Sequence, residues 1–274
     1  MQMEFMRCCY ICLFCCLLSL LSCTPKNYNP EQEQAYIEAD NALWEYYEAE
    51  GERLMELYAE DEELLYSKAV ELEEYSDRRN RELAIEYSAT PSGLRRCFML
   101  RNDLSKTTLK EILKELPRDL RKSNAAKAIK EHIATEQIEV GMDYYPVDVV
   151  TTDGSRIEWD KYNGKNIFLL YGGLGCMGPS GRRDLAALRE EYSKDDLAIL
   201  IYYPVGSLEE LQELDIEFAS DYTFISELMT DYSHFKIKYG CQATPTCYFI
   251  DREGIVTLKT EGLPDMVALR ELIK

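Results

Sequence analysis

The residues that most constrain the fold are TPTCYFIDREGIV, at positions 244–256, where a proline stands directly before an apolar run. Proline has no N–H to donate to a sheet, so it is confined to the start of a strand, to an edge or to a bulge. We therefore expect a buried strand to follow Pro245 and to turn back at Asp251–Gly254 as a β-hairpin. A cis Thr244–Pro245 bond would give the tight turn required here, although an ordinary trans proline at a strand start fits the same pattern.

Apolar runs of strand length alternate with helical patterns in the rest of this half of the chain. Such an alternation predicts an α/β fold, with a mixed sheet flanked by helices. In chain order, the expected elements are a hairpin over 147–159 with its turn at Asp153–Gly154, a strand over 166–171, a helix over 182–192, a strand over 197–203, a short helix capped by Ser207, a helix over 226–240, the hairpin after Pro245, and a closing helix from Pro264.

The preceding hundred or so residues have no strand pattern, and we expect residues 35–137 to form an all-helical region. From Ala35 to about Ser88, leucines and tyrosines recur every three, four or seven residues beside a strongly acidic face. The many tyrosines raise the alternative of a sugar-binding surface, but helical spacing favours packing. The acidic face is interpreted as solvated surface.

The first residues of the chain have the pattern of an export signal. Arg7 precedes an apolar run from Cys8 to Leu21, which is shorter than the roughly 20 residues that a membrane-spanning helix needs. The run ends in Leu-Leu-Ser-Cys, which resembles a bacterial lipobox with Cys23 as the lipidated cysteine. We expect residues 1–22 to be a signal peptide and residues 23–34 a lipid-anchored tether. An ordinary secretory signal with a chance cysteine is the alternative.

Charge and histidine content exclude several kinds of partner. The net charge is −19 and the sequence pI about 4.6, so the chain repels phosphate backbones and a nucleic-acid partner is not expected. The two histidines, His132 and His234, are far apart and neither lies in a Cys/His cluster. We therefore expect no metal site and no cofactor.

The second half of the sequence resembles the thioredoxin-like proteins of the TlpA/ResA and AhpC/TSA type. The resemblance is carried by YGCQATPTCYFIDREGIV, which matches the proline strand of that family, and by VGMDYYPVDVVTTDGSRIEWDKYNGKNIFLLY, which matches its lead-in hairpin and the strand that delivers the active-site cysteine. It implies a thioredoxin-like domain over 138–274. The helical stretch before it is similar to the spacer of exported lipoproteins of this kind.

The resemblance also implies a redox site, and the sequence departs from it there. Family members carry W-C-x-x-C at the strand-to-helix turn, whereas this chain has GCMGPSG at 175–181. Cys176 matches the attacking cysteine, and either Ser180 or Gly181 replaces the resolving one, so the site is degenerate. Thr244 and Pro245 would border the client groove. Cys241 could act as a displaced resolving thiol or be a buried apolar residue, and Cys97 and Cys247 are expected in the core.

Two functions follow from these residues. The first is an envelope thiol–disulfide oxidoreductase-like lipoprotein with weak or single-cysteine activity through Cys176, acting on envelope proteins or small thiols. The second is a non-catalytic binding or scaffold lipoprotein that keeps the thioredoxin fold. Either would lie in the bacterial cell envelope, anchored to a membrane through lipid at Cys23, on the periplasmic side or in an outer-membrane leaflet.

Overall fold

The computed structural model describes residues 27–214 and 221–273. The expected signal peptide and Cys23 lie outside these residues. The chain divides into two compact units, the first ending at Ile129 and the second beginning at Lys130. None of the described helices is both long and apolar enough to cross a membrane.

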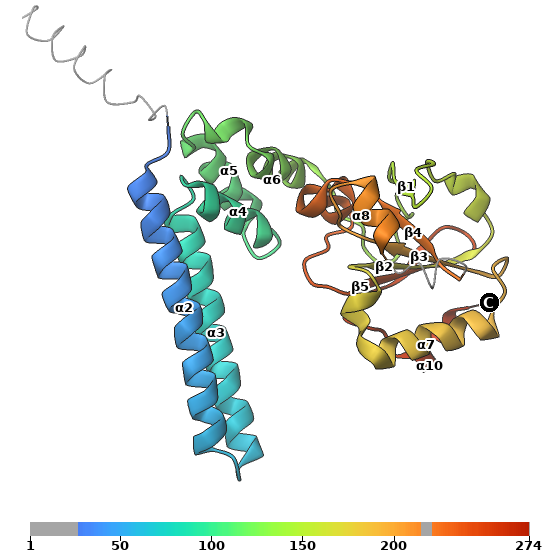
Figure 1. The fold of residues 1–274 in the computed structure, drawn as a ribbon, viewed down its shortest axis with the longest axis horizontal. Coiled ribbons are helices and arrows are strands. Elements are labelled where there is room, and N and C mark those ends of the chain that lie inside the picture. The colour runs from blue at the N-terminus through green and yellow to red at the C-terminus, as the bar shows by residue number, and fades with distance from the viewer. Residues whose placement is uncertain (1–26, 215–220, 274) are drawn as a thin grey trace, which may run out of the picture. The chain divides into compact units, whose positions relative to one another are not determined.

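The first unit is built of helices around a long antiparallel pair (Figure 1). Asn29 accepts a hydrogen bond from the Glu31 amide and Pro30 occupies the first turn, which explains why a helix begins here. The tether expected to run to residue 34 is therefore helical from Pro30 onward. The helices of this unit are α2 Pro30–Leu57, α3 Glu62–Glu86, α4 Pro91–Met99, α5 Lys106–Glu115, a 3-10 turn Leu120–Lys122 and the start of α6 Asn124–Ala134.

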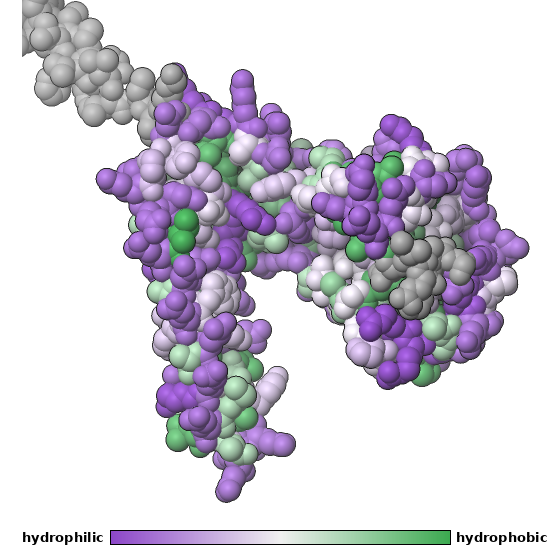
Figure 2. All heavy atoms as spheres, in the orientation of Figure 1, coloured by the Kyte–Doolittle hydropathy of each residue, from purple (hydrophilic) through white to green (hydrophobic). Residues whose placement is uncertain are grey.

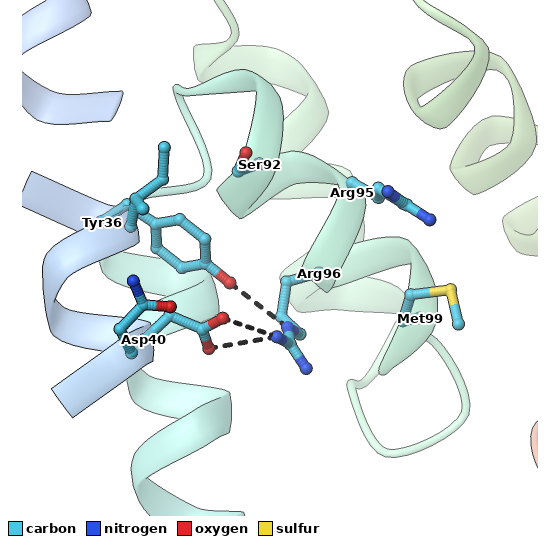
Figure 3. Close-up of a pocket in the computed structure, with 8 residues that line it drawn as sticks. Tyr36, Asp40, Ser92, Arg95, Arg96 and Met99 are labelled. Atoms are coloured by element: carbon cyan, nitrogen blue, oxygen red, sulfur yellow. Dashed lines mark hydrogen bonds and ion pairs between the residues drawn. The ribbon is translucent and has the colours of Figure 1, made fainter. Parts of the chain in front are cut away.

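An ion pair joins α2 to α4 at one end of the long pair. The Arg96 guanidinium donates to both carboxylate oxygens of Asp40, at 3.1 and 2.8 Å, and to the Tyr36 hydroxyl at 3.2 Å (Figure 3). Ser92 donates through its amide and its hydroxyl to the carboxylate of Glu33. Tyr36 is buried here and packs as its helical spacing predicted, whereas Tyr46, Tyr66 and Tyr75 on the long pair are 48%, 73% and 41% exposed.

The second unit contains a six-stranded sheet in the order β1-β4-β3-β2-β5-β6. Strands β2, β3 and β4 run parallel, whereas β5 is antiparallel to β2, β6 to β5 and β1 to β4. The sheet is therefore mixed, as the sequence predicted. The strands are β1 Val150–Thr151, β2 Asn166–Tyr171, β3 Leu197–Tyr202, β4 Thr223–Ser226, β5 Thr246–Ile250 and β6 Val256–Glu261.

Side chains that alternate along the strands form a core on each face of the sheet. One core contains a stack of the rings of Tyr171, Tyr202, Phe235 and Tyr239. The other is closed by helices α7 and α10, which bury Leu185, Leu188 and Leu269 against it. The helices of this unit are α7 Gly178–Glu191, α8 Leu208–Glu213, α9 His234–Lys238 and α10 Met266–Leu272, with α6 ending just inside it.

Three expected elements differ in the structure. The helix expected over 226–240 is reduced to α9, because Ser226 ends β4 and because Leu228 and Thr230 have positive φ, which a helix excludes. The expected hairpin over 147–159 turns at Asp153–Gly154, but its arms share a single isolated bridge and β1 pairs with β4 instead. The closing helix begins at Met266 on an Asp265 cap rather than at Pro264.

Candidate functional site

The candidate site lies where β2 ends and β5 begins. Parallel strands present their carboxyl ends at one edge of a sheet, and β5 runs the opposite way beside β2, with Thr246 opposite Tyr171. The turn after β2 and the segment before β5 therefore meet at the same edge. These two segments carry the cysteine and the proline that the sequence singled out.

Cys176 lies in a 3-10 turn, Leu174–Met177, directly before α7. The first and last residues of this turn, Leu174 and Met177, are buried in the core below α7, whereas Cys176 is exposed. The thiol donates a hydrogen bond to the carbonyl oxygen of Gly172 at 3.1 Å. The turn is therefore fixed from below and presents its sulfur to solvent.

Two glycines with positive φ make this turn possible. A Cβ on Gly172 (φ +112°) would lie 2.8 Å from the Cβ of Thr244, and one on Gly173 (φ +80°) would lie 2.1 Å from the ring of Tyr203. The Tyr203 hydroxyl accepts a hydrogen bond from the Leu174 amide at 3.0 Å. Tyr203, the residue directly after β3, thus supports the cysteine turn. The sequence analysis missed this role, although Tyr203 follows a buried strand that is parallel to β2.

The Thr244–Pro245 bond is cis, as the sequence predicted. Thr244 is exposed and contacts Gly172, the residue whose carbonyl binds the Cys176 thiol, while Pro245 is buried. The carbonyl of Pro245 accepts a hydrogen bond from the Gly262 amide at 2.8 Å, which ties the proline to the loop after β6. The structure thereby brings the cysteine turn and the Thr244–Pro245 segment into contact through Gly172.

No disulfide joins Cys176 to another described cysteine. None of the four described cysteines is in a disulfide, and Cys176 is the exposed one among them. Burial raises the pKa of both Cys97 and Cys247 to about 12, so neither is a thiolate at neutral pH. Cys241 is buried in the core with the aromatic stack, and its sulfur lies 3.4 Å from the Tyr248 hydroxyl.

The two positions that could replace the resolving cysteine differ in their surroundings. Ser180 is exposed on the first turn of α7. Gly181 is buried, and a Cβ there would lie 2.3 Å from the end of the Leu263 side chain. Ser180 is thus the position that can carry a longer side chain without repacking.

Two observations decide the architecture: the strand order of the sheet and the helix that follows the cysteine turn. The second unit has a thioredoxin-like fold. Among residues 27–214 and 221–273, no three side chains of the His, Cys, Asp and Glu types converge as a metal site would require.

Comparisons with known proteins add solved structures of low identity. No family model matches the chain, and no curated protein matches it. A thiol-disulfide oxidoreductase from Bacteroides fragilis aligns with 14% identity and a TM-score of 0.41, over 49% of this chain and 99% of its own. The thioredoxin domain of a thiol-disulfide oxidoreductase from Bacteroides vulgatus aligns with 14% identity and a TM-score of 0.41, over 50% of this chain and 100% of its own. An exposed lipoprotein thioredoxin from Streptococcus pneumoniae aligns with 20% identity and a TM-score of 0.36, over 48% of this chain and 98% of its own.

Proposed function

We propose that the second unit performs thiol–disulfide exchange with a single cysteine, Cys176. The observation that carries the proposal is the position of this thiol, which is exposed on a buried turn and in contact, through Gly172, with the segment at Pro245. An exposed thiol at a strand-to-helix turn is accessible to a disulfide, whereas the other three described thiols are buried.

The reaction begins when the deprotonated Cys176 sulfur attacks one sulfur of a disulfide R–S–S–R′. A bond forms between Cys176 and R–S, the S–S bond of the disulfide breaks, and R′–S⁻ leaves and takes up a proton. The hydrogen bond to the Gly172 carbonyl uses the thiol proton, so this bond is given up when the sulfur reacts. The product is a mixed disulfide on Cys176.

Release of the product needs a thiol from outside the chain. The Ser180 hydroxyl has essentially no anion at neutral pH, whereas a free thiol with a pKa near 8.5 has a few per cent thiolate. A small thiol R″–SH attacks the mixed disulfide and liberates R–SH, which leaves R″–S–S–Cys176. A second R″–SH then restores the Cys176 thiol and forms R″–S–S–R″. The two electrons that reduce the client therefore come from two external thiols.

A non-catalytic binding module is the second candidate, favoured by the hydrogen bond that engages the thiol and by the retained Thr244–Pro245 segment. A trapping experiment separates the two. An activated aromatic disulfide should label the native chain at Cys176, and Cys176→Ser should abolish the labelling, while Cys247→Ser serves as the matched control and should not. No labelling of the native chain would favour the binding module.

A turnover assay tests the missing second thiol. With dithiothreitol as reductant, we expect little catalysed reduction of insulin by the native chain. Rapid turnover that survives Cys176→Ser would refute the site. Turnover that requires both Cys176 and Cys241 would instead identify Cys241 as the resolving thiol.

We also propose that the protein is anchored in the bacterial cell envelope through lipid on Cys23, because the Leu-Leu-Ser-Cys sequence closes a short apolar run. Clients would then be envelope proteins or small thiols. Mass spectrometry of the membrane fraction should find lipid on Cys23, and Cys23→Ala should release the chain. An intact segment 1–22 in the mature protein would contradict the anchor.

A further inference from the structure

The outer part of the α2–α3 pair, residues 45–77, exposes apolar side chains that its own packing does not use. Within it, Leu54 and Leu72 are the buried apolar residues of the two helices. Leu57 and Leu64 are 57% and 37% exposed. Figure 2 shows hydrophobic side chains in green among purple ones along this part of the pair. Helices of this kind are normally stabilised by tertiary packing of an apolar face, so this surface lacks the cover that such a face usually has.

A hollow of about 410 Å³ opens between the same two helices. Tyrosines line it from both sides, together with two carboxylates that are already paired with cations of this chain. The rings of Tyr46 and Tyr75 meet edge to face at 5.6 Å, and the guanidinium of Arg78 lies 5.8 Å from the Tyr75 ring. The lining residues are Tyr46, Glu50, Arg53, Leu54, Tyr58, Lys68, Glu71, Leu72 and Tyr75.

The charge of this segment is strongly one-sided. Residues 45–77 contain thirteen acidic side chains and two basic ones, Arg53 and Lys68. Both basic side chains form ion pairs within the segment, with Glu50 and Glu71. The remaining eleven carboxylates have no cation of the segment to balance them. This surface therefore repels a second copy of itself, and it also repels anionic lipid and nucleic acid.

We propose that the outer α2–α3 surface, residues 45–77, is the docking site of a cationic amphipathic helix from a partner protein. Leu57 and Leu64 lie about three helical turns from Tyr46 and Tyr75, on the side of the pair where those two rings meet. The apolar face of such a helix covers Leu57 and Leu64, and its lysines or arginines lie over the carboxylates and the tyrosine rings. Tyr75 already holds one guanidinium in this manner, that of Arg78. The charge excess selects a basic partner over a second copy of this chain.

Binding of a probe peptide tests the proposal on the full chain. The probe is a fluorescent peptide of Lys and Leu whose order places the leucines on one face of a helix, and its control has the same composition in a scrambled order. The variant Leu57→Gln/Leu64→Gln removes two exposed apolar side chains but keeps good helix formers. Its matched control, Val140→Gln/Val267→Gln, removes two exposed apolar residues of the second unit, which are 57% and 68% exposed.

We expect the amphipathic peptide to bind, the scrambled one to bind more weakly, and Leu57→Gln/Leu64→Gln to lose about tenfold in affinity while the control variant does not. Equal binding of both peptides, with no effect of Leu57→Gln/Leu64→Gln, would overturn the proposal and leave general attraction to an acidic chain. A dimer in analytical ultracentrifugation that disappears in Leu57→Gln/Leu64→Gln would also overturn it, because a second copy would then occupy the surface.

Discussion

Gly173→Ala should destabilise the second unit far more than Gly178→Ala, although the two glycines flank the same cysteine turn. Their backbones are nearly alike, with φ +80° and ψ 169° at Gly173 and φ +64° and ψ 178° at Gly178. This region is essentially reserved for glycine, and another residue there costs of order 1–3 kcal/mol. A Cβ at Gly178 meets nothing within 4 Å, whereas one at Gly173 would lie within 2.8 Å of three ring atoms of Tyr203.

The overlap with Tyr203 adds an overpacking cost of about 1–3 kcal/mol, so Gly173→Ala should lower the free energy of unfolding by roughly 2–6 kcal/mol in total. Typical domains have a free energy of unfolding of about 5–15 kcal/mol, so the expected loss is a large fraction of the stability. The difference between the two variants isolates the ring contact, since the backbone term is shared. Combining Gly173→Ala with Tyr203→Leu should recover part of the loss, because the ring is then absent.

The chain provides a simple assay, because it has two tryptophans and they lie in different units. In a Trp44→Phe background, the fluorescence of Trp159 reports urea unfolding of the second unit, where its indole N–H donates to the Val147 carbonyl at 2.7 Å. The rate at which an activated disulfide labels Cys176 gives a second readout of the turn. Equal losses of stability for Gly173→Ala and Gly178→Ala would refute the contact with Tyr203.

Three further predictions concern other residues. A Ser180→Cys variant should gain insulin-reducing turnover that depends on Cys176. Gly181→Cys should instead lose about 1–3 kcal/mol of stability, because its side chain meets Leu263. Turnover in Gly181→Cys but not in Ser180→Cys would show that position 181, not 180, corresponds to the resolving cysteine. The hydrogen bond that His234 Nδ1 donates to the Glu131 carboxylate, at 2.5 Å, raises the pKa of His234 above 6.5, so the stability that this pair contributes is full below about pH 6.5 and is lost as pH rises through the raised pKa. Unfolding followed by Trp159 fluorescence should show this loss as less than about 1 kcal/mol, because His234 is half exposed, and Glu131→Gln should remove the pH dependence. The hydroxyl of Ser76 is buried with no hydrogen-bond partner, so Ser76→Ala should stabilise the first unit by up to about 1–3 kcal/mol. The control Ser67→Ala, at an exposed site on the same helix, should leave the stability unchanged. Unfolding followed by Trp44 fluorescence in a Trp159→Phe background measures both variants.

Patterns within a single stretch of sequence were sufficient to predict the buried strands. All six residues of β2 are buried, as are those of β3, and both were predicted as continuous apolar runs. Pro245 predicted the start of β5, because proline cannot lie within a paired ladder. The position of Cys176 followed from its place between such a strand and a helix.

Long-range pairing decided the rest. Strand β4 has only four residues and exists because Thr223, Phe224 and Ile225 pair with β3, which no local pattern reveals. Tyr203 reaches the cysteine turn only through the parallel alignment of β3 with β2, 29 residues away in sequence. The side of the sheet taken by Cys241 likewise depends on how the chain returns from α9 into β5.

A dithiol site closes on itself when it is oxidised, so its oxidised form is the same whatever molecule it last met. Cys176 has no exposed partner among the described thiols of its own chain. Each oxidation by disulfide exchange therefore leaves the other reactant covalently attached until a further thiol removes it. Non-reducing electrophoresis or intact-mass measurement of protein taken directly from cells would then read out a population of adducts, one species for each molecule that had reached the sulfur.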